Sequence, residues 1–135
     1  MCSSLIMNNL FVIFLDLTLF FLRSLTFSFA DSVDDGGWTS LIWACEFCHA
    51  DVARYLLDKK CDPLIRDAEQ NIALHWSAFS GSSEITEMLL NEGCDVNAVN
   101  VHGDTPLYVS YFSCRLLKLF IILCEHCRNI YSHLE

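Results

Sequence analysis

The sequence predicts an all-α solenoid of stacked helical repeats, because its middle part matches itself when it is shifted by 33 residues. Identical residues then align at Leu41 and Leu74, Trp43 and Trp76, and Cys61 and Cys94. A second observation is the short helical spacing of apolar residues inside each 33-residue unit. A period of this length indicates repeats that bury their apolar faces against their neighbours.

Each unit has the sequence pattern of a turn, a short inner helix and an outer helix. Leu41 and Ala44 lie three residues apart, on one face of the first inner helix. The two outer helices are predicted from the apolar stripes Val52, Tyr55, Leu56 and Ile85, Met88, Leu89. Gly93 lies where the second outer helix should end in a left-handed residue. The first unit has Lys60 there, which should cost about 1 kcal/mol relative to glycine.

The start of each unit resembles the opening motif of the ankyrin repeat. Residues 105–108, Thr-Pro-Leu-Tyr, are the nearest copy, and residues 39–42 and 72–75 are looser copies. The resemblance implies an ankyrin-repeat solenoid over residues 31–110, with two full repeats (35–67 and 68–100) and a partial third (101–110). Apolar flanks at 1–30 and 111–135 are predicted to be helical, and the second is a C-terminal tail without the repeat pattern. Such a short stack is marginally stable unless its ends act as caps.

Four residues indicate a function: Trp38, Trp43, Glu46 and Trp76. Trp43 and Trp76 lie one repeat apart, so their rings should flank one slot, with Trp38 at the turn before the first helix. Glu46 follows Trp43 by three residues and shares its helical face. Indole rings attract cations, and a carboxylate can accept the N–H that mono- and dimethyllysine keep. The cluster therefore predicts a methyllysine-binding site; the alternative is that the rings are packing residues of a module that binds an unmodified protein partner.

Several segments resemble the ankyrin region of the euchromatic histone-lysine methyltransferase family. They are Asp34-Asp35-Gly36-Gly37-Trp38-Thr39, Ile42-Trp43-Ala44, Leu74-His75-Trp76 and residues 98–107. The resemblance covers residues 34–109, about 56% of the chain. It implies a nuclear reader of mono- or dimethylated lysine on a histone tail, with a cage of Trp38, Trp43, Glu46 and Trp76.

Within the same resemblance, Asp104 is expected to contact the peptide beside the cage. The family's catalytic SET domain would follow the repeats, and this chain ends at Glu135. We therefore expect a binding fragment of such a methyltransferase, without enzyme activity of its own and without a cofactor.

The charge of the chain favours a basic partner. The 135 residues hold 17 Asp and Glu against 8 Lys and Arg, and 14 of those acids but only four of the bases lie between residues 31 and 110. An acidic surface repels phosphates, so no direct binding of nucleic acid is expected, whereas a basic protein segment would be attracted.

Cysteine and histidine give weaker signals. Cys45 and Cys48 form one C-x-x-C pair, and Cys124 and Cys127 form another. We expect no zinc site, because an ankyrin unit needs no metal and the spacing between the pairs matches no compact zinc fold. An odd number of cysteines after residue 30 favours a reducing compartment. His75 occupies the histidine position of the opening motif and is expected to bond turn backbone.

Residues 5–30 allow three interpretations. Their length fits a membrane span or a signal sequence, but Asp16 and Arg23 interrupt the apolar run. If the span were genuine, the protein would be membrane-associated and not nuclear. The interpretation we favour is that both ends are non-native flanks, produced by a truncated or mis-spliced gene model, because composition changes abruptly where the family match stops.

Overall fold

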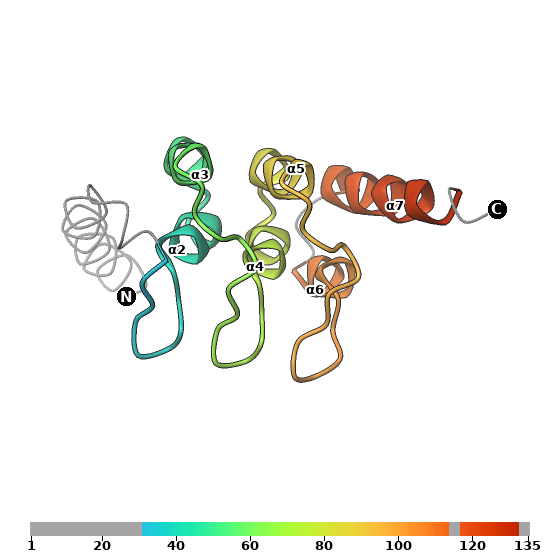
Figure 1. Ribbon diagram of the computed structural model, residues 1–135. Coiled ribbons are helices and arrows are strands. Elements are labelled where there is room, and N and C mark those ends of the chain that lie inside the picture. Colours follow the sequence, from blue (N-terminus) through green and yellow to red (C-terminus); the bar gives the residue numbers. More distant parts are fainter. Residues whose placement is uncertain (1–30, 114–116, 133–135) are drawn as a thin grey trace, which may run out of the picture.

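The computed structural model describes residues 31–113 and 117–132, and these residues form stacked pairs of antiparallel helices. The helices are α2 (Ser40–Glu46), α3 (Ala50–Asp58), α4 (Ala73–Ser80), α5 (Ser83–Asn91), α6 (Pro106–Phe112) and α7 (Leu117–Ser132). Figure 1 shows two layers: α2, α4 and α6 form the inner layer, and α3, α5 and α7 form the outer layer. The loops before the inner helices project as hairpins from the side of the inner layer that faces away from the outer layer. This is the predicted ankyrin-repeat solenoid.

The inner helices start in the same way because a side chain caps each first turn. The hydroxyl of Thr39 accepts the N–H of Ile42 at 3.2 Å, and that of Thr105 accepts the N–H of Tyr108 at 3.3 Å. Ile72 has no hydroxyl at the equivalent position. There, Nδ1 of His75 instead accepts the backbone N–H of Ile72 at 3.2 Å. The second unit therefore keeps its helix start although the capping residue is apolar.

Left-handed backbone recurs at three places in the 33-residue unit. The hairpin tips have φ between +63° and +80°, the ends of the inner helices +56° and +81°, and the ends of the outer helices +62° and +86°. The hairpin tips are Gly37, Gln70 and Gly103. The inner helices end at Cys48 and Gly81, and the outer helices end at Lys60 and Gly93. The prediction for Lys60 and Gly93 is confirmed. Among the residues that the structure describes, non-glycine residues therefore occupy three positions where glycine is favoured: Cys48, Lys60 and Gln70.

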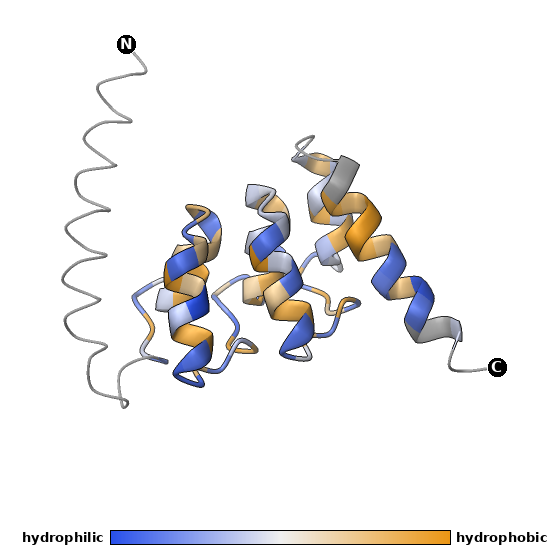
Figure 2. Cartoon of the chain, turned by 90° about the horizontal axis from the view of Figure 1, so that it is seen from above, coloured by the Kyte–Doolittle hydropathy of each residue, from blue (hydrophilic) through white to orange (hydrophobic). Residues whose placement is uncertain are grey.

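The core lies between the two layers and between neighbouring repeats. Leu41 and Leu74, the aligned leucines of the inner helices, are 1% and 0% exposed. Helix α4 packs against α2 on one side and α6 on the other, and α3 and α5 are also in contact. Figure 2 shows hydrophobic and hydrophilic stretches alternating along each outer helix, as an amphipathic helix requires. Each repeat therefore buries its apolar residues between its own two helices and against the neighbouring repeats.

The third unit extends further than the partial repeat expected over residues 101–110. Helix α6 runs to Phe112, and α7 lies in the outer layer, in contact with α5 and α6. Leu119 and Leu123 of α7 are 1% and 0% exposed, and their spacing of four places them on one helical face. The tail lacks the ankyrin motif of an outer helix, but its apolar spacing is sufficient to cover the end of the stack. The predicted apolar segment 1–30 lies outside the described residues.

Candidate functional site

The first hairpin fixes the position of Trp38. An isolated antiparallel bridge joins Val33 and Thr39 at its base. Oδ1 of Asp34 accepts the backbone N–H of Gly36 at 2.9 Å and that of Trp38 at 2.8 Å. The N–H of Asp34 in turn donates to the carbonyl oxygen of Trp38 at 3.1 Å. These bonds hold the Trp38 backbone at the foot of α2.

Trp43 and Trp76 occupy equivalent places on α2 and α4. The indole N–H of Trp43 donates to Oδ2 of Asp34 at 3.0 Å. The indole N–H of Trp76 donates to Oδ2 of Asp67 at 2.9 Å, one repeat further along. Each ring is therefore tied to the hairpin that precedes its own helix.

The three indoles form one cluster with Trp38 in contact with both others. The ring centroids of Trp38 and Trp43 are 4.7 Å apart, and those of Trp38 and Trp76 are 4.3 Å apart. The ring planes are tilted by 56° and 53° respectively. The sequence predicted a slot flanked by Trp43 and Trp76; in the structure Trp38 packs against both rings. All three side chains are half-buried, so each keeps part of its surface open to a ligand.

Two phenylalanines extend this cluster, and the sequence argument missed them. The ring of Phe47 stacks on Trp43 with centroids 5.7 Å apart and an interplanar angle of 9°. The ring of Phe79 meets Trp76 edge-on, with centroids 6.0 Å apart. The signal was the spacing: Phe47 follows Trp43 by four residues and Phe79 follows Trp76 by three, and both spacings place the rings on one helical face.

Glu46 and Asp104 lie at two different places relative to the tryptophans. Glu46 ends α2, three residues after Trp43, and its Oε2 atom is buried. Asp104 lies in the third hairpin, where its backbone carbonyl is 3.1 Å from Nε2 of His75. The structure therefore places Glu46 on the same helix as Trp43, and Asp104 at the junction between the second and third repeats.

His75 joins two repeats through both ring nitrogens. Nδ1 accepts a backbone N–H within its own repeat, so Nε2 must carry the proton that is donated to the carbonyl of Asp104. Burial lowers the pKa of His75 from its usual 6.5, which favours the same neutral form. The arrangement agrees with the structural role expected for this histidine.

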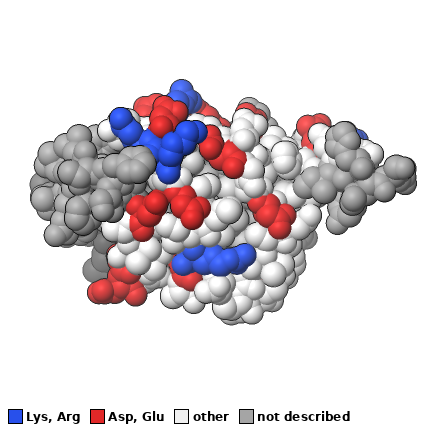
Figure 3. Space-filling view, viewed as in Figure 1, with Lys and Arg blue, Asp and Glu red and all other residues white. Residues whose placement is uncertain are grey.

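The hairpins beside the cluster are acidic. They carry Asp34, Asp35, Asp67, Glu69 and Asp104. Arg66 is the one Lys or Arg residue in these hairpins, and its guanidinium donates to the backbone carbonyls of Gln70 and Val99 at 2.7 and 2.9 Å. Figure 3 shows acidic side chains at several places on the visible face, over both the hairpins and the helices. A cationic segment would therefore be attracted to this side of the molecule.

The third unit carries an exposed aromatic surface. Tyr111 and Phe112 are 73% and 71% exposed, and the ring of Phe112 lies 5.4 Å from that of Tyr108. Phe112 is the repeat equivalent of Phe79, and the Phe79 carbonyl accepts the hydroxyl of Ser113 at 2.6 Å. Aromatic surface thus continues from the tryptophan cluster onto α6.

Three of the cysteines belong to the packed core. Cys45, Cys61 and Cys94 are buried free thiols. Burial raises the pKa of Cys45, and it raises those of Cys61 and Cys94 to about 12. Within residues 31–113 and 117–132, no group of three or more His, Cys, Asp or Glu side chains could hold a metal ion.

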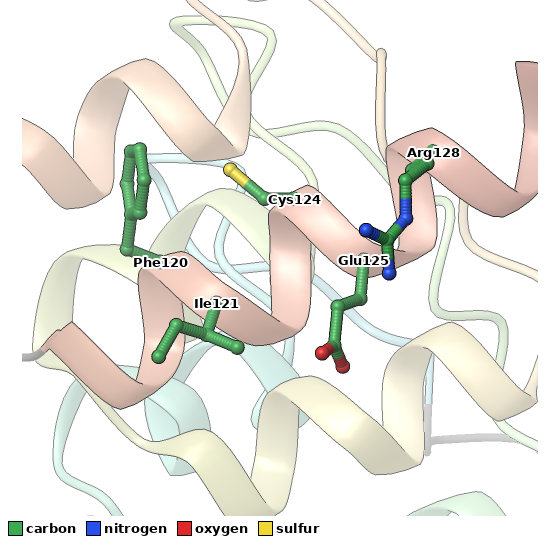
Figure 4. A pocket seen from close by; sticks show the side chains of 5 residues that line it. All are labelled: Phe120, Ile121, Cys124, Glu125 and Arg128. Carbon is green, nitrogen blue, oxygen red and sulfur yellow. The ribbon is translucent and has the colours of Figure 1, made fainter.

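A separate shallow pocket lies on α7. Its volume is about 290 Å³, and it is lined by Phe120, Ile121, Cys124, Glu125 and Arg128 (Figure 4). All five residues belong to one helix, so the pocket is a surface hollow and does not lie between elements. In the described part of the chain, no helix has the length and apolar character needed to cross a membrane.

Comparison with known proteins identifies the repeats. The family model described as ankyrin repeats (many copies) matches residues 41–90. A palmitoyltransferase ZDHHC17 of Danio rerio is 35% identical over 71 residues, which are 51% of this chain and 12% of that protein. A protein fem-1 homolog A-like of Mus musculus is 44% identical over 71 residues, covering 53% of this chain and 11% of that protein. The palmitoyltransferase AKR1 of Lachancea kluyveri is 30% identical over 86 residues, covering 63% and 12%.

These findings correct the expected membership of the euchromatic histone-lysine methyltransferase family. The relatives named above are palmitoyltransferases and a fem-1 protein. The residues that suggested the methyltransferase family include turn residues that the ankyrin hairpin itself requires: Asp34 caps the turn, and Gly37 and Gly103 have φ of +78° and +80°. Such residues show the repeat and do not separate one ankyrin family from another.

The chain spans about an eighth of the length of these relatives, so the activity that names the two palmitoyltransferases belongs to much longer proteins. The matched residues belong to the repeat region, which is a non-catalytic module. The chain therefore carries ankyrin repeats, and this part of it is a protein-interaction module.

Proposed function

We propose that the inner-helix side of the solenoid binds an unmodified basic segment of a protein partner, with a lysine or arginine side chain placed on the tryptophan cluster. The observation that carries the proposal is the contact of three half-buried indoles beside acidic hairpins. An indole face attracts a cation through the ring quadrupole. The surrounding carboxylates would raise the local concentration of a basic segment.

The expected contribution of the cluster is moderate. A cation over one indole gains about 0.5–1 kcal/mol at an exposed site. Contact with two tilted faces would then contribute about 1–2 kcal/mol, or roughly a 5- to 30-fold change in affinity. The exposed rings on α6 offer apolar contacts for neighbouring residues of the same segment.

A second candidate is that the cluster reads mono- or dimethylated lysine. It is supported by the number of indoles, since methyl groups make the ammonium more apolar and favour contact with rings over water. It is also supported by the position of Glu46 on the helix of Trp43, because its carboxylate could accept the remaining N–H of the lower methylation states. This candidate is not tied to a histone tail.

Four synthetic peptides that differ at one central position test both candidates. The position carries lysine, arginine, dimethyllysine or norleucine within an otherwise constant basic sequence, and binding to the full chain is followed by tryptophan fluorescence. Similar affinities for lysine and dimethyllysine, both well above norleucine, support the unmodified partner. A tenfold preference for dimethyllysine supports the second candidate, and a norleucine peptide that binds as well as the others refutes both.

Variants locate the binding to the cluster. Trp43→Phe keeps an aromatic face but removes the stronger indole, so the lysine peptide should bind several-fold more weakly. Glu46→Gln should weaken binding by removing one negative charge, whereas Glu87→Gln makes the same chemical change on the exposed outer surface of α5. Equal losses in the two glutamate variants would mean that only net charge matters.

The proposed function leaves two locations in the cell to be distinguished. A nuclear module and a membrane-associated scaffold held through residues 5–30 predict different distributions in the cell. Microscopy of the tagged full chain, together with salt extraction of membrane fractions, distinguishes them. Release by salt without detergent argues against the membrane-associated form.

A further inference from the structure

The residue that caps each of the three hairpins varies with the presence of a tryptophan on the inner helix that follows. The position that caps each hairpin lies nine residues before a fixed place on the inner helix. The three pairs are Asp34 with Trp43, Asp67 with Trp76, and Asn100 with Val109. The cap is therefore an aspartate where the inner helix that follows carries an indole, and an asparagine where it does not.

In all three hairpins, Oδ1 of the capping residue accepts two backbone N–H groups of the turn. Oδ1 of Asp67 accepts the backbone N–H groups of Glu69 and Asn71 at 2.9 and 2.8 Å. Oδ1 of Asn100 accepts the equivalent N–H groups, of the second and fourth residues after it, at 2.9 and 3.0 Å. Oδ1 of Asp34 makes the matching pair of bonds in the first hairpin. An asparagine is thus sufficient to organise the hairpin.

The second terminal atom of the capping side chain differs between the aspartates and the asparagine. Oδ2 of Asp34 accepts the indole N–H of Trp43, and Oδ2 of Asp67 accepts that of Trp76. At Asn100 the corresponding atom is Nδ2, which donates to Oδ1 of Asn71 at 3.0 Å. An amide nitrogen cannot accept an indole N–H, so only a carboxylate serves both the hairpin and the ring.

We infer that Asp34 and Asp67 are positioning residues of the tryptophan cluster, whose carboxylates set the site's preference for cations. This inference rests on the proposed function. Each carboxylate orients a ring, and it also occupies the only hydrogen-bond donor of that indole. A ligand at Trp43 or Trp76 consequently meets π faces that cannot donate to an anion or a carbonyl. The adjacent negative charge further polarises the ring towards a cation.

Asp34→Asn is the sharper test, because Asn100 shows that the hairpin tolerates an amide and because the side chain of Asp34 is exposed. The variant keeps Oδ1 and replaces the acceptor of the Trp43 N–H by a donor. We expect a 3- to 10-fold loss of affinity for the lysine peptide. In a Trp43→Phe background the same change should have little further effect, because phenylalanine has no N–H to hold. An equal loss in both backgrounds would overturn the inference.

A readout without ligand separates this inference from the proposed function. In the full chain, the Trp43 indole N–H should show a displaced proton NMR resonance and slow exchange with solvent. Asp34→Asn should move that resonance and speed its exchange at least tenfold, while the Trp76 indole changes little. Asp95→Asn is the matched control: Oδ1 of Asp95 also accepts the backbone N–H two residues later, that of Asn97, at 2.9 Å, whereas the indole N–H groups of Trp43 and Trp76 bond Asp34 and Asp67.

The NMR and peptide-binding results together distinguish the positioning role of Asp34 from the proposed function. If Asp34→Asn leaves the Trp43 N–H unchanged, the positioning role is refuted whatever the peptide does. If the indole responds but the wild-type chain does not bind the lysine peptide, the proposed function fails and the positioning of the ring stands. Equal responses to Asp34→Asn and Asp95→Asn would show a general effect of charge and would also overturn the inference.

Discussion

Replacing Lys60 by glycine should stabilise the protein. Lys60 follows α3 with φ of +62°, and Gly93 occupies the equivalent position after α5 with φ of +86°. The backbone N–H of each residue bonds the carbonyl three residues before it, at 2.9 and 3.0 Å. The two helix ends therefore have the same geometry, and only the first holds a side chain in the left-handed region.

The size of the effect follows from two opposing terms. An L-residue in the left-handed region loses about 1–2 kcal/mol relative to its preferred backbone, and glycine removes most of that strain. Glycine also makes the unfolded chain more flexible, which offsets about 0.4–1 kcal/mol. The net gain is about 0.5–1 kcal/mol, which raises the Tm of a unit of this size by roughly 2–8 °C.

Urea and thermal unfolding of four chains measure the effect: wild type, Lys60→Gly, Gly93→Lys, and the exchange variant that carries both changes. A Cβ at position 93 meets no atom within 4 Å, so Gly93→Lys introduces the backbone strain without a clash. The two single variants should shift stability in opposite directions by similar amounts, and the exchange variant should resemble wild type. If Lys60→Gly lowers the midpoint, the lysine side chain contributes more than its backbone costs, and the reasoning is wrong.

Three further outcomes are expected. Gly37→Ala should destabilise by about 2 kcal/mol or more, and clearly more than Gly103→Ala, because a Cβ at Gly37 would lie 3.1 Å from the second hairpin's backbone while the one at Gly103 meets nothing within 4 Å; equal urea midpoints for the two would contradict this. Burial lowers the pKa of His75, so below pH 6.5 the unfolded state binds more protons than the folded state. The contribution of this histidine to the free energy of unfolding should therefore be fully present above pH 6.5 and fall as the pH drops below it. A His75→Gln variant whose urea midpoint depends on pH as strongly as that of the wild type would disprove the link. Exposed Cys48 should be alkylated before buried Cys45 when the native chain is mapped by mass spectrometry, and simultaneous labelling would argue against the packed core.

The repeat architecture could be predicted because its signal is periodic. A shift of 33 residues aligned Leu41 with Leu74, and both are buried at the same place on their helices. The left-handed ends at Lys60 and Gly93 followed from the same register. Periodicity works here because each unit solves the same packing problem against its neighbours, so equivalent residues have equivalent environments.

The end of the stack was harder to predict, because a terminal unit has only one neighbour. Helix α7 lacks the ankyrin pattern, yet it covers α5 and α6 through Leu119 and Leu123. A spacing of four apolar residues is common to most amphipathic helices, so the sequence alone did not show where this helix would pack.

Family membership failed as a prediction for a related reason. Gly37 and Gly103 belong to two of the segments that resembled the methyltransferases, and both occupy left-handed hairpin tips. Any ankyrin repeat with this turn favours glycine there. Residues selected by backbone geometry therefore identify the repeat and carry little information about a particular partner.

The candidate site shows where sequence register stops being informative. Register placed Trp43 and Trp76 one repeat apart, because both belong to inner helices. The sequence also grouped Trp38 with these two rings, but it did not show how a hairpin residue would pack against them. The structure puts the Trp38 ring 4.3–4.7 Å from both others, through a backbone that Asp34 holds in place. The same carboxylate holds the Trp43 indole at 3.0 Å, so one side chain bonds both the Trp43 ring and the Trp38 backbone. A ligand that needs the cluster to open must therefore work against Asp34, whereas a ligand that lies across the tilted faces uses the arrangement as it stands.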